Sequence, residues 1–328
     1  MALNAFAVAR PNQALGTGDV DALAIEHFTG VVEETIARMS KAAPFVDMRP
    51  VRGTNTITNK GLGSSTLQVV TAGQTPDATS QNEVNKISLT VDTLVLARAF
   101  EFLLDGFQTD IDYRAGIARE HGKEIAKFTD QAFFIQAAKA AALSASAYGA
   151  LNGHSGGSTE TLALAADATD PAALYTALSD LFAQMEEKDV DPANEDVMVA
   201  LRPAAFYAML DAEQIVNGTY VTAKGTRIEN AKILKAFGVP VVSSNNVPNT
   251  NISSHKLSNA ANSNAYDGDF TKLVAVAFAP RALLAGETIP LTTATWYSEE
   301  VKGHFIDAHL SFGVTPNRAE FAGRILIP

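Results

Sequence analysis

The chain has 328 residues, of which 47% are apolar and 19% are charged, and it contains no cysteine. Its net charge of −11 argues against a DNA-binding groove, which requires a cationic face, and the lack of cysteine excludes disulfides and thiolate metal sites. The length favours two domains, and the low charged fraction fits either a surface that packs against copies of itself or a neutral, alanine-rich enzyme.

The N-terminal segment predicts an arm followed by a helix. Residues 1–16 lack the basic start and apolar core of a signal peptide, and no stretch of the chain reaches the roughly 20 apolar residues of a membrane span, so we expect neither secretion nor membrane insertion. Residues 1–18 are expected to be extended. From Asp19 to Met39, apolar residues at intervals of three and four predict an amphipathic helix, capped by Thr17 or Asp19.

The next region predicts a long hairpin. Ser65–Thr71 and Lys86–Leu96 have the composition of strands, and in the second of them apolar and polar residues alternate. The sequence between them is polar and rich in turn-forming residues. Because a two-stranded hairpin is marginally stable alone in water, we expect it to lie on another surface, and an adjacent subunit is the natural candidate.

The run from Thr109 to about Leu143 predicts one long helix. Small or apolar residues recur in it at every seventh position, namely Ile111, Ala118, Ile125 and Ala132. Thr109 and Asp112 have the spacing of a capping box. At about 50 Å, such a helix needs a partner surface along its whole length, so we take it as the spine of a domain.

The second half of the chain predicts an α/β domain inserted between the spine helix and the strands that cover it. Ser144–Asp170 is small and polar, which indicates a loop and a domain boundary. An Asn- and Ser-rich irregular loop is expected at Ser244–Asp267. The elements expected in order are a helix at Pro171–Lys188, a strand at Asp196–Leu201, a helix at Pro203–Leu210, strands at Val239–Ser243 and Leu273–Ala279, and closing strands at His304–Phe312 and Glu320–Ile327.

One motif suggests catalysis. Gly153–Gly157 matches the G-x-S-x-G nucleophile elbow, with Ser155 as the nucleophile, but an elbow requires a strand before it and a helix after it. An alanine-rich helix end precedes this motif instead, and a flexible linker also carries such glycines, so we predict no catalytic residue. No metal or cofactor site is predicted either, because the histidines lack ligand spacing; they are His27, His121, His154, His255, His304 and His309.

The order of these segments resembles that of the major capsid protein of tailed bacteriophages, which has the HK97 fold, and most closely that of short-tailed podoviruses. The resemblance covers nearly the whole chain. It is carried by the spine sequence DYRAGIAREHGKEIAKFTDQAFF at 112–134, by VDPANEDVMVALRPAAFYAML at 190–210, by AFGVPVVSSNNVP at 236–248 and by AHLSFGVTPNRAEFAGRILI at 308–327.

The resemblance implies an α+β fold of four parts. Residues 1–50 would be the N-terminal arm, and residues 51–100 the extended β-hairpin that this family calls the E-loop. Residues 101–170 together with 289–328 would be the peripheral P-domain, which holds the spine helix. Residues 171–288 would be the inserted α/β domain, called the axial A-domain.

The resemblance also implies a function. Such proteins form hexamers and pentamers of an icosahedral shell around double-stranded DNA, assisted by scaffolding protein and portal and sometimes by a decoration protein. The expected location is the virion, after assembly in the cytoplasm of a bacterial host. Thr54–Asn85 would contact a neighbouring subunit, and the tip of the A-domain, which we place at the Asn-rich loop, would face the capsomer centre. Lys60 and Lys86 lie in or near the E-loop, but no matching partner for a cross-link can be identified.

Two alternatives remain at this point. One is the shell of a nanocompartment with the same fold, which would enclose an enzyme instead of a genome. The other is a hydrolase that uses Ser155.

Overall fold

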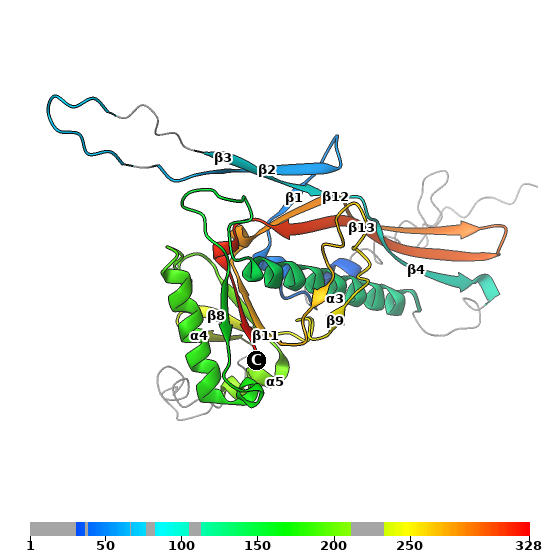
Figure 1. Ribbon diagram of the computed structural model, residues 1–328. Coiled ribbons are helices and arrows are strands. Elements are labelled where there is room, and N and C mark those ends of the chain that lie inside the picture. Colours follow the sequence, from blue (N-terminus) through cyan, green and yellow to red (C-terminus); the bar gives the residue numbers. More distant parts are fainter. Residues whose placement is uncertain (1–30, 37–38, 66, 77–82, 105–112, 211–232) are drawn as a thin grey trace, which may run out of the picture. The chain divides into compact units, whose positions relative to one another are not determined.

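The structure is a computed structural model, and it describes residues 31–36, 39–65, 67–76, 83–104, 113–210 and 233–328 (Figure 1). The fold is α+β, and it divides into two compact units. The first unit comprises Met1–Ser40, Asp92–Thr129 and Glu287–Phe312, and the second comprises Lys41–Val91, Asp130–Gly286 and Gly313–Pro328. The long helix α3 (Tyr113–Ala142) and the strands β12 (Leu283–Ser298) and β13 (Gly303–Pro316) each contribute residues to both units.

In the first unit, strands pair beside the first half of α3. Strand β4 (Val95–Phe102) pairs antiparallel with the first part of β13, from Gly303 opposite Phe102 to Leu310 opposite Val95. Arg98 and Asp307 face each other in this register, and the guanidinium donates two hydrogen bonds of 2.8 and 2.6 Å to the carboxylate. Planar, bidentate pairs of this kind are among the stronger ion pairs, and this one fixes the strand register.

The core of the first unit joins α3 to a strand and to the helical residues 31–36. Val32, Ala118 and Ile306 are fully buried against one another. A Cβ at Gly122 of α3 would lie 2.9 Å from the carbonyl oxygen of Val32, so the two helical segments touch at a position that only glycine can occupy. Ile306 belongs to β13, which confirms the expectation that a C-terminal strand returns to the spine helix.

The second unit is built on a six-stranded mixed sheet in the order β5-β14-β11-β6-β8-β7. Its central strand β11 pairs antiparallel with β14 and with β6, while β5 and β8 join parallel to β14 and β6. The strand bounds are β5 Ser158–Thr161, β6 Met198–Leu201, β7 Ile233–Ala236, β8 Val239–Ser243, β11 Leu273–Phe278 and β14 Ala322–Leu326.

Helices cover both faces of this sheet. Helix α4 (Pro171–Glu186) packs Leu181 against Gly323 of β14, while Phe134 of α3 meets Phe278 of β11 edge-on, with the ring centroids 6.3 Å apart. Gly323 pairs with the residue before Phe278, and successive residues of a strand point to opposite faces. Helices α3 and α4 therefore lie on opposite faces, which explains why every residue of β11 is buried. The short helix α5 (Pro203–Leu210) follows β6.

The Asn-rich loop holds a compact polar cluster. Its short strands β9 (Asn251–Ile252) and β10 (Gly268–Asp269) pair, and between them Asp267 accepts hydrogen bonds from the His255 backbone N–H at 2.9 Å and the Ser258 hydroxyl at 2.6 Å. The imidazole of His255 is buried, stacks on Tyr266, and accepts the Leu257 N–H at Nδ1. Burial lowers the pKa of His255, and the nearby Asp267 opposes this shift only in part.

This arrangement predicts a pH effect on stability. Because the pKa of His255 is lowered in the folded chain, the unfolded chain binds a proton first, and the free energy of unfolding should fall as the pH drops below about 6.5. In His255→Gln, the free energy of unfolding should fall less steeply with decreasing pH than in the parent chain, when urea unfolding is measured from pH 7 to pH 5. Parallel curves for the parent and His255→Gln would contradict the prediction.

Several expectations from the sequence are confirmed. The spine helix, the helix at Pro171 and the strands at 196–201, 239–243, 273–279, 304–312 and 320–327 are all present, with bounds that differ from the expected ones by at most four residues. Asp170 caps α4 by accepting the Ala173 N–H at 3.0 Å, and Pro171 occupies the first turn. The capping box at Thr109 and most of the helix from Asp19 lie outside the described residues, but residues 31–36 are helical.

Three expectations are wrong. Ser65–Thr71 forms no strand in its described residues; the first hairpin strand is β2 (Thr56–Leu62) instead. The single strand expected at Lys86–Leu96 is divided between β3 (Val84–Thr90) and β4. The loop expected at Ser144–Asp170 contains β5 and the 3-10 turn Ala165–Thr169, because β5 pairs with β14 through its backbone although its side chains are polar. The four-part division of the chain stays a prediction.

Candidate assembly interface

The hairpin of β2 and β3 has two chemically distinct faces. Its strands pair antiparallel from Thr56 opposite Thr90 to Leu62 opposite Val84 (Figure 1). Because directly opposed residues share a face, the two faces can be assigned from the register. The outer face carries Thr58, Lys60, Leu62, Val84, Lys86 and Ser88, and all six are exposed. The inner face carries Ile57, Asn59, Gly61, Asn85, Ile87 and Leu89.

The inner face has an apolar part and a polar part within the second unit. Ile57 and Leu89 pack with Val91 and with Leu284 of β12. Beside them, Asn59 Nδ2 donates to the Tyr148 hydroxyl at 2.8 Å and to Asn317 Oδ1 at 2.9 Å, and the Tyr148 hydroxyl donates to Asn317 Oδ1. Burial raises the pKa of the Tyr148 phenol, so the hydroxyl keeps the proton that it donates.

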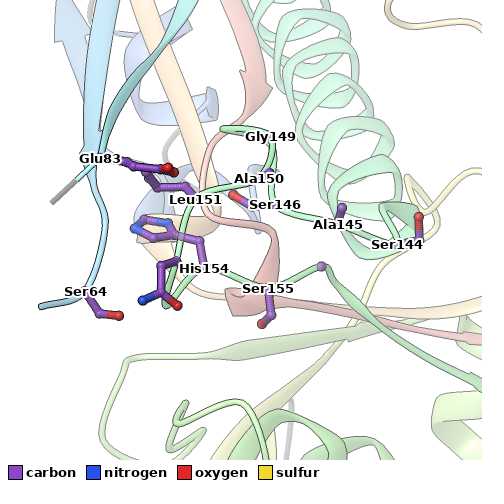
Figure 2. Close-up of a pocket in the computed structure, with 12 residues that line it drawn as sticks. Ser64, Glu83, Ser144, Ala145, Ser146, Gly149, Ala150, Leu151, His154 and Ser155 are labelled. Carbon is purple, nitrogen blue, oxygen red and sulfur yellow. The ribbon is translucent and has the colours of Figure 1, made fainter. Parts of the chain in front are cut away.

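The chain just beyond β2 and β3 is held by one backbone bond across the hairpin and by two contacts with the loop at 148–154. Gly63 N–H donates to the Glu83 carbonyl at 2.8 Å, and Ser64 N–H donates to the Asn152 carbonyl at 2.8 Å. The imidazole of His154 lies 3.0 Å from the Leu62 carbonyl through Nε2, which must donate because a carbonyl only accepts. Figure 2 shows His154 beside Leu151 and Glu83, where the hairpin meets this loop.

Beyond these contacts, apolar side chains stand in solvent. Leu67 is 91% exposed and Val69 is 95% exposed, and neither lies in a strand. Full burial of side chains of this size is worth about 1.5–3 kcal/mol each. Scattered apolar residues on a surface need no explanation, but here they extend from a hairpin whose base is firmly held. The loop is therefore a candidate for burial by another surface.

The motif at Gly153–Gly157 does not form a nucleophile elbow. Helix α3 precedes it and strand β5 follows it, which reverses the order of strand, turn and helix that an elbow requires. Figure 2 shows the Ser155 side chain turned away from the imidazole of His154. The nearby imidazole is therefore not placed to take a proton from Ser155.

The glycines of this motif have a packing role instead. A Cβ at Gly156 would collide with the carbonyl oxygen of Leu143, and a Cβ at Gly157 would collide with the backbone of Ala141, at the end of α3. Lys188 holds the segment from the other side, because its amine donates to the carbonyls of Gly156 and Gly157 at 3.2 and 2.8 Å. Burial lowers the pKa of Lys188.

A recess of about 620 Å³ beside the hairpin base is lined mainly by small residues and holds one carboxylate, Glu83, and one imidazole, His154.

The part of the chain that the structure describes contains no group of three or more His, Asp or Glu side chains able to hold a metal ion. No helix within the described ranges is both long and apolar enough to cross a membrane.

The contact between Gly61 and Tyr148 predicts a large effect of one substitution. A Cβ at Gly61 would lie 2.8 Å from the Tyr148 ring, whereas a Cβ at Gly63 would find its nearest neighbours at 3.4 Å. Gly61→Val should displace the ring and lower the free energy of unfolding by about 2 kcal/mol, as overpacking does. It should also speed protease cleavage within residues 63–83. Gly63→Ala is the control; equal effects of the two variants would contradict the assignment of Tyr148 as the anchor.

Comparison with known protein families identifies the family of this chain. Residues 72–283, well over half of the chain, match the family profile described as Gp10A-like major capsid protein. The chain belongs to this family. It is a capsid shell protein, as the resemblance of its sequence implied.

Solved structures show the same fold. The capsid structure of cyanophage P-SCSP1u is 20% identical, with a TM-score of 0.72 and coverage of 87% of this chain and 86% of that one. The mature capsid of bacteriophage PhiM1 is 22% identical, with a TM-score of 0.71 and coverage of 88% and 87%. A virus-like particle from Pyrococcus furiosus is 10% identical, with a TM-score of 0.53 and coverage of 92% and 98%. No curated protein matches the chain.

In this capsid protein, the anchor of the hairpin could not be found from the sequence. Tyr148 and Asn317 are 89 and 258 residues away from Asn59, and neither belongs to a recognisable motif. The one local indication of a tightly packed site was the glycine-rich segment at 149–157, where other parts of the chain come so close that there is little space for a side chain. From the sequence alone, these glycines were interpreted as part of a flexible linker or of a nucleophile elbow.

Proposed function

We propose that this chain forms hexamers and pentamers of an icosahedral phage capsid that encloses double-stranded DNA. In each capsomer, the hairpin loop would lie across a neighbouring copy. The observation that carries this proposal is the exposure of Leu67 and Val69 on a hairpin whose base is fixed by Tyr148 and Asn317. A neighbouring subunit is the partner that a shell protein always has, and it would remove this apolar surface from water.

The proposed partners and parts follow from the same assignment. Scaffolding protein and portal would act during assembly in the bacterial cytoplasm, and a decoration protein could bind outside. Residues 1–50 would serve as the N-terminal arm, 51–100 as the E-loop, 101–170 with 289–328 as the P-domain, and 171–288 as the A-domain. The role is structural and not enzymatic, which agrees with the orientation of Ser155 in Figure 2.

Size-exclusion chromatography with negative-stain electron microscopy tests the proposal. The purified chain, alone and with its scaffolding protein, should give closed particles or free hexamers and pentamers. A monodisperse monomer or dimer at high concentration under both conditions would contradict it. The contents of particles isolated from infected cells decide between a genome and the enzyme cargo of a nanocompartment. DNA that resists added nuclease is the expected result, and a protein cargo would favour the nanocompartment.

A further inference from the structure

The outer face of the hairpin carries a charge arrangement that the isolated subunit does not compensate. Lys60 and Lys86 are directly opposed in the register of β2 and β3, and both are exposed. Like charges in opposed positions destabilise a strand pair. Within the described residues, no carboxylate lies at ion-pair distance from either amine. Leu62 and Val84, the next opposed pair, are 60% and 62% exposed, so an apolar patch adjoins the two charges.

A second surface of the same chain has the opposite charge, and only part of that charge is compensated, by an ion pair of 3.4 Å between Glu195 and Arg281. The turn at 186–196, at the C-terminal end of α4, holds six carboxylates, namely Glu186, Glu187, Asp189, Asp191, Glu195 and Asp196. We call it the acidic turn. Its one cation, Lys188, is directed inward to the carbonyls of Gly156 and Gly157. Negative charge at a helix C-terminus also opposes the helix dipole. In the described part of the chain, Glu186, Glu187 and Asp189 make no ion pair.

We infer that the outer face of the hairpin docks on the acidic turn of a neighbouring copy through Lys60 and Lys86. This inference rests on the proposed function, because it names the partner surface of the hairpin. Each of the two surfaces is unfavourable in the free subunit, and each supplies the charge that the other lacks. The exposed pair Leu62 and Val84 would add apolar contact beside the ion pairs, and the net charge of −11 makes any copy of this chain an acidic partner.

A charge-swap series tests this inference. Lys60→Glu with Lys86→Glu should reduce the yield of closed particles at least tenfold, and so should Glu186→Lys with Glu187→Lys. Combining all four substitutions should restore the yield to within twofold of the parent. Lys60→Arg with Lys86→Arg keeps the charges and is the control. All substituted side chains are exposed, so the circular dichroism spectra and thermal midpoints of the subunits should not change.

Zero-length carbodiimide cross-linking of parent particles provides the direct readout, since this reagent joins amines and carboxylates that are already in contact. Mass spectrometry should find Lys60 or Lys86 joined to the acidic turn in a ladder of covalently linked copies. Cross-links confined to one copy or directed to another protein would overturn the inference, as would normal assembly of Lys60→Glu with Lys86→Glu. Those results would leave the proposed function standing, whereas a parent chain that forms no particles or capsomers would overturn both.

Discussion

Replacing Ser65–Gln81 with a two-residue Asn-Gly turn should abolish closed particles while leaving a folded subunit. The bonds that hold the hairpin base, from Ser64 to Asn152 and from Gly63 to Glu83, lie outside the deleted stretch. The inner face with Tyr148 is also untouched. The deletion removes Leu67 and Val69, whose burial at each contact is worth about 3–6 kcal/mol together. Because every subunit of a shell makes this contact, the loss is repeated over the whole particle.

The measurement is particle yield by sedimentation, with the thermal midpoint of the subunit beside it. Yield should fall at least tenfold, and the midpoint should stay close to that of the parent. The variant Leu67→Ser with Val69→Ser keeps the length of the loop and should lower the yield by an intermediate amount. Particles of normal yield and size from the deletion variant would show that the loop does not join subunits.

Asp130→Ala should lower the free energy of unfolding by about 3 kcal/mol. Asp130 lies on α3 and is fully buried, and its carboxylate accepts the backbone N–H of Lys41 at 2.9 Å and that of Ala42 at 3.2 Å. The side-chain amide of Asn246 donates to it as well, at 3.2 Å. Hydrogen bonds to a charged group contribute about 1.5–3 kcal/mol each, and burying the charge offsets part of that sum. The substitution removes the acceptor of the buried Ala42 N–H and of the two partly buried donors, Lys41 N–H and the Asn246 amide.

Urea unfolding followed by circular dichroism measures this effect. Asp130→Asn keeps the shape and one acceptor oxygen, so its loss should be smaller than that of Asp130→Ala. Asp180→Ala replaces an exposed carboxylate on α4 and should change the free energy of unfolding by less than about 0.5 kcal/mol. If Asp130→Ala unfolded at the same urea concentration as Asp180→Ala, Asp130 could not be the group that ties residues 41–42 to α3.

The sequence predicted those parts of the fold whose signal is local. The spine helix was found because small and apolar residues recur at four successive seven-residue positions, and α4 was found because Pro171 marks its first turn. Strand β11 was found because all six of its residues are apolar, which agrees with its position between α3 and α4. In each case, neighbouring residues specify the element without help from distant ones.

The hairpin shows where local pattern fails. Val69 and Val70 have high strand propensity, so the first strand was predicted at Ser65–Thr71, yet both residues lie outside the strands of the hairpin. The true strand, TITNKGL, has little apolar character, and its position is fixed by Asn59 and Gly61 against Tyr148. The contact of Asn59 with Tyr148 spans 89 residues, and no local window of the sequence contains both partners.

The break between β3 and β4 has a similar cause. The alternating pattern continues from Ile87 to Leu96, but the chain leaves the hairpin after Thr90, where the Val91 N–H bonds to the Asn55 carbonyl. Beyond it, β4 pairs with β13, which lies about 200 residues away along the chain and fixes its register through Arg98 and Asp307. Pairing partners at this separation determine where the strands end, and the local sequence contains no information about those partners.

A cryo-electron microscopy reconstruction of particles assembled from this chain, at a resolution that traces the hairpin, would show directly where the hairpin loop lies. We expect residues 63–83 to lie on the surface of a neighbouring copy, with Leu67 and Val69 buried there and with Lys60 and Lys86 facing carboxylates of that copy. Particles in which this loop stays in solvent, or folds back on its own subunit, would contradict it.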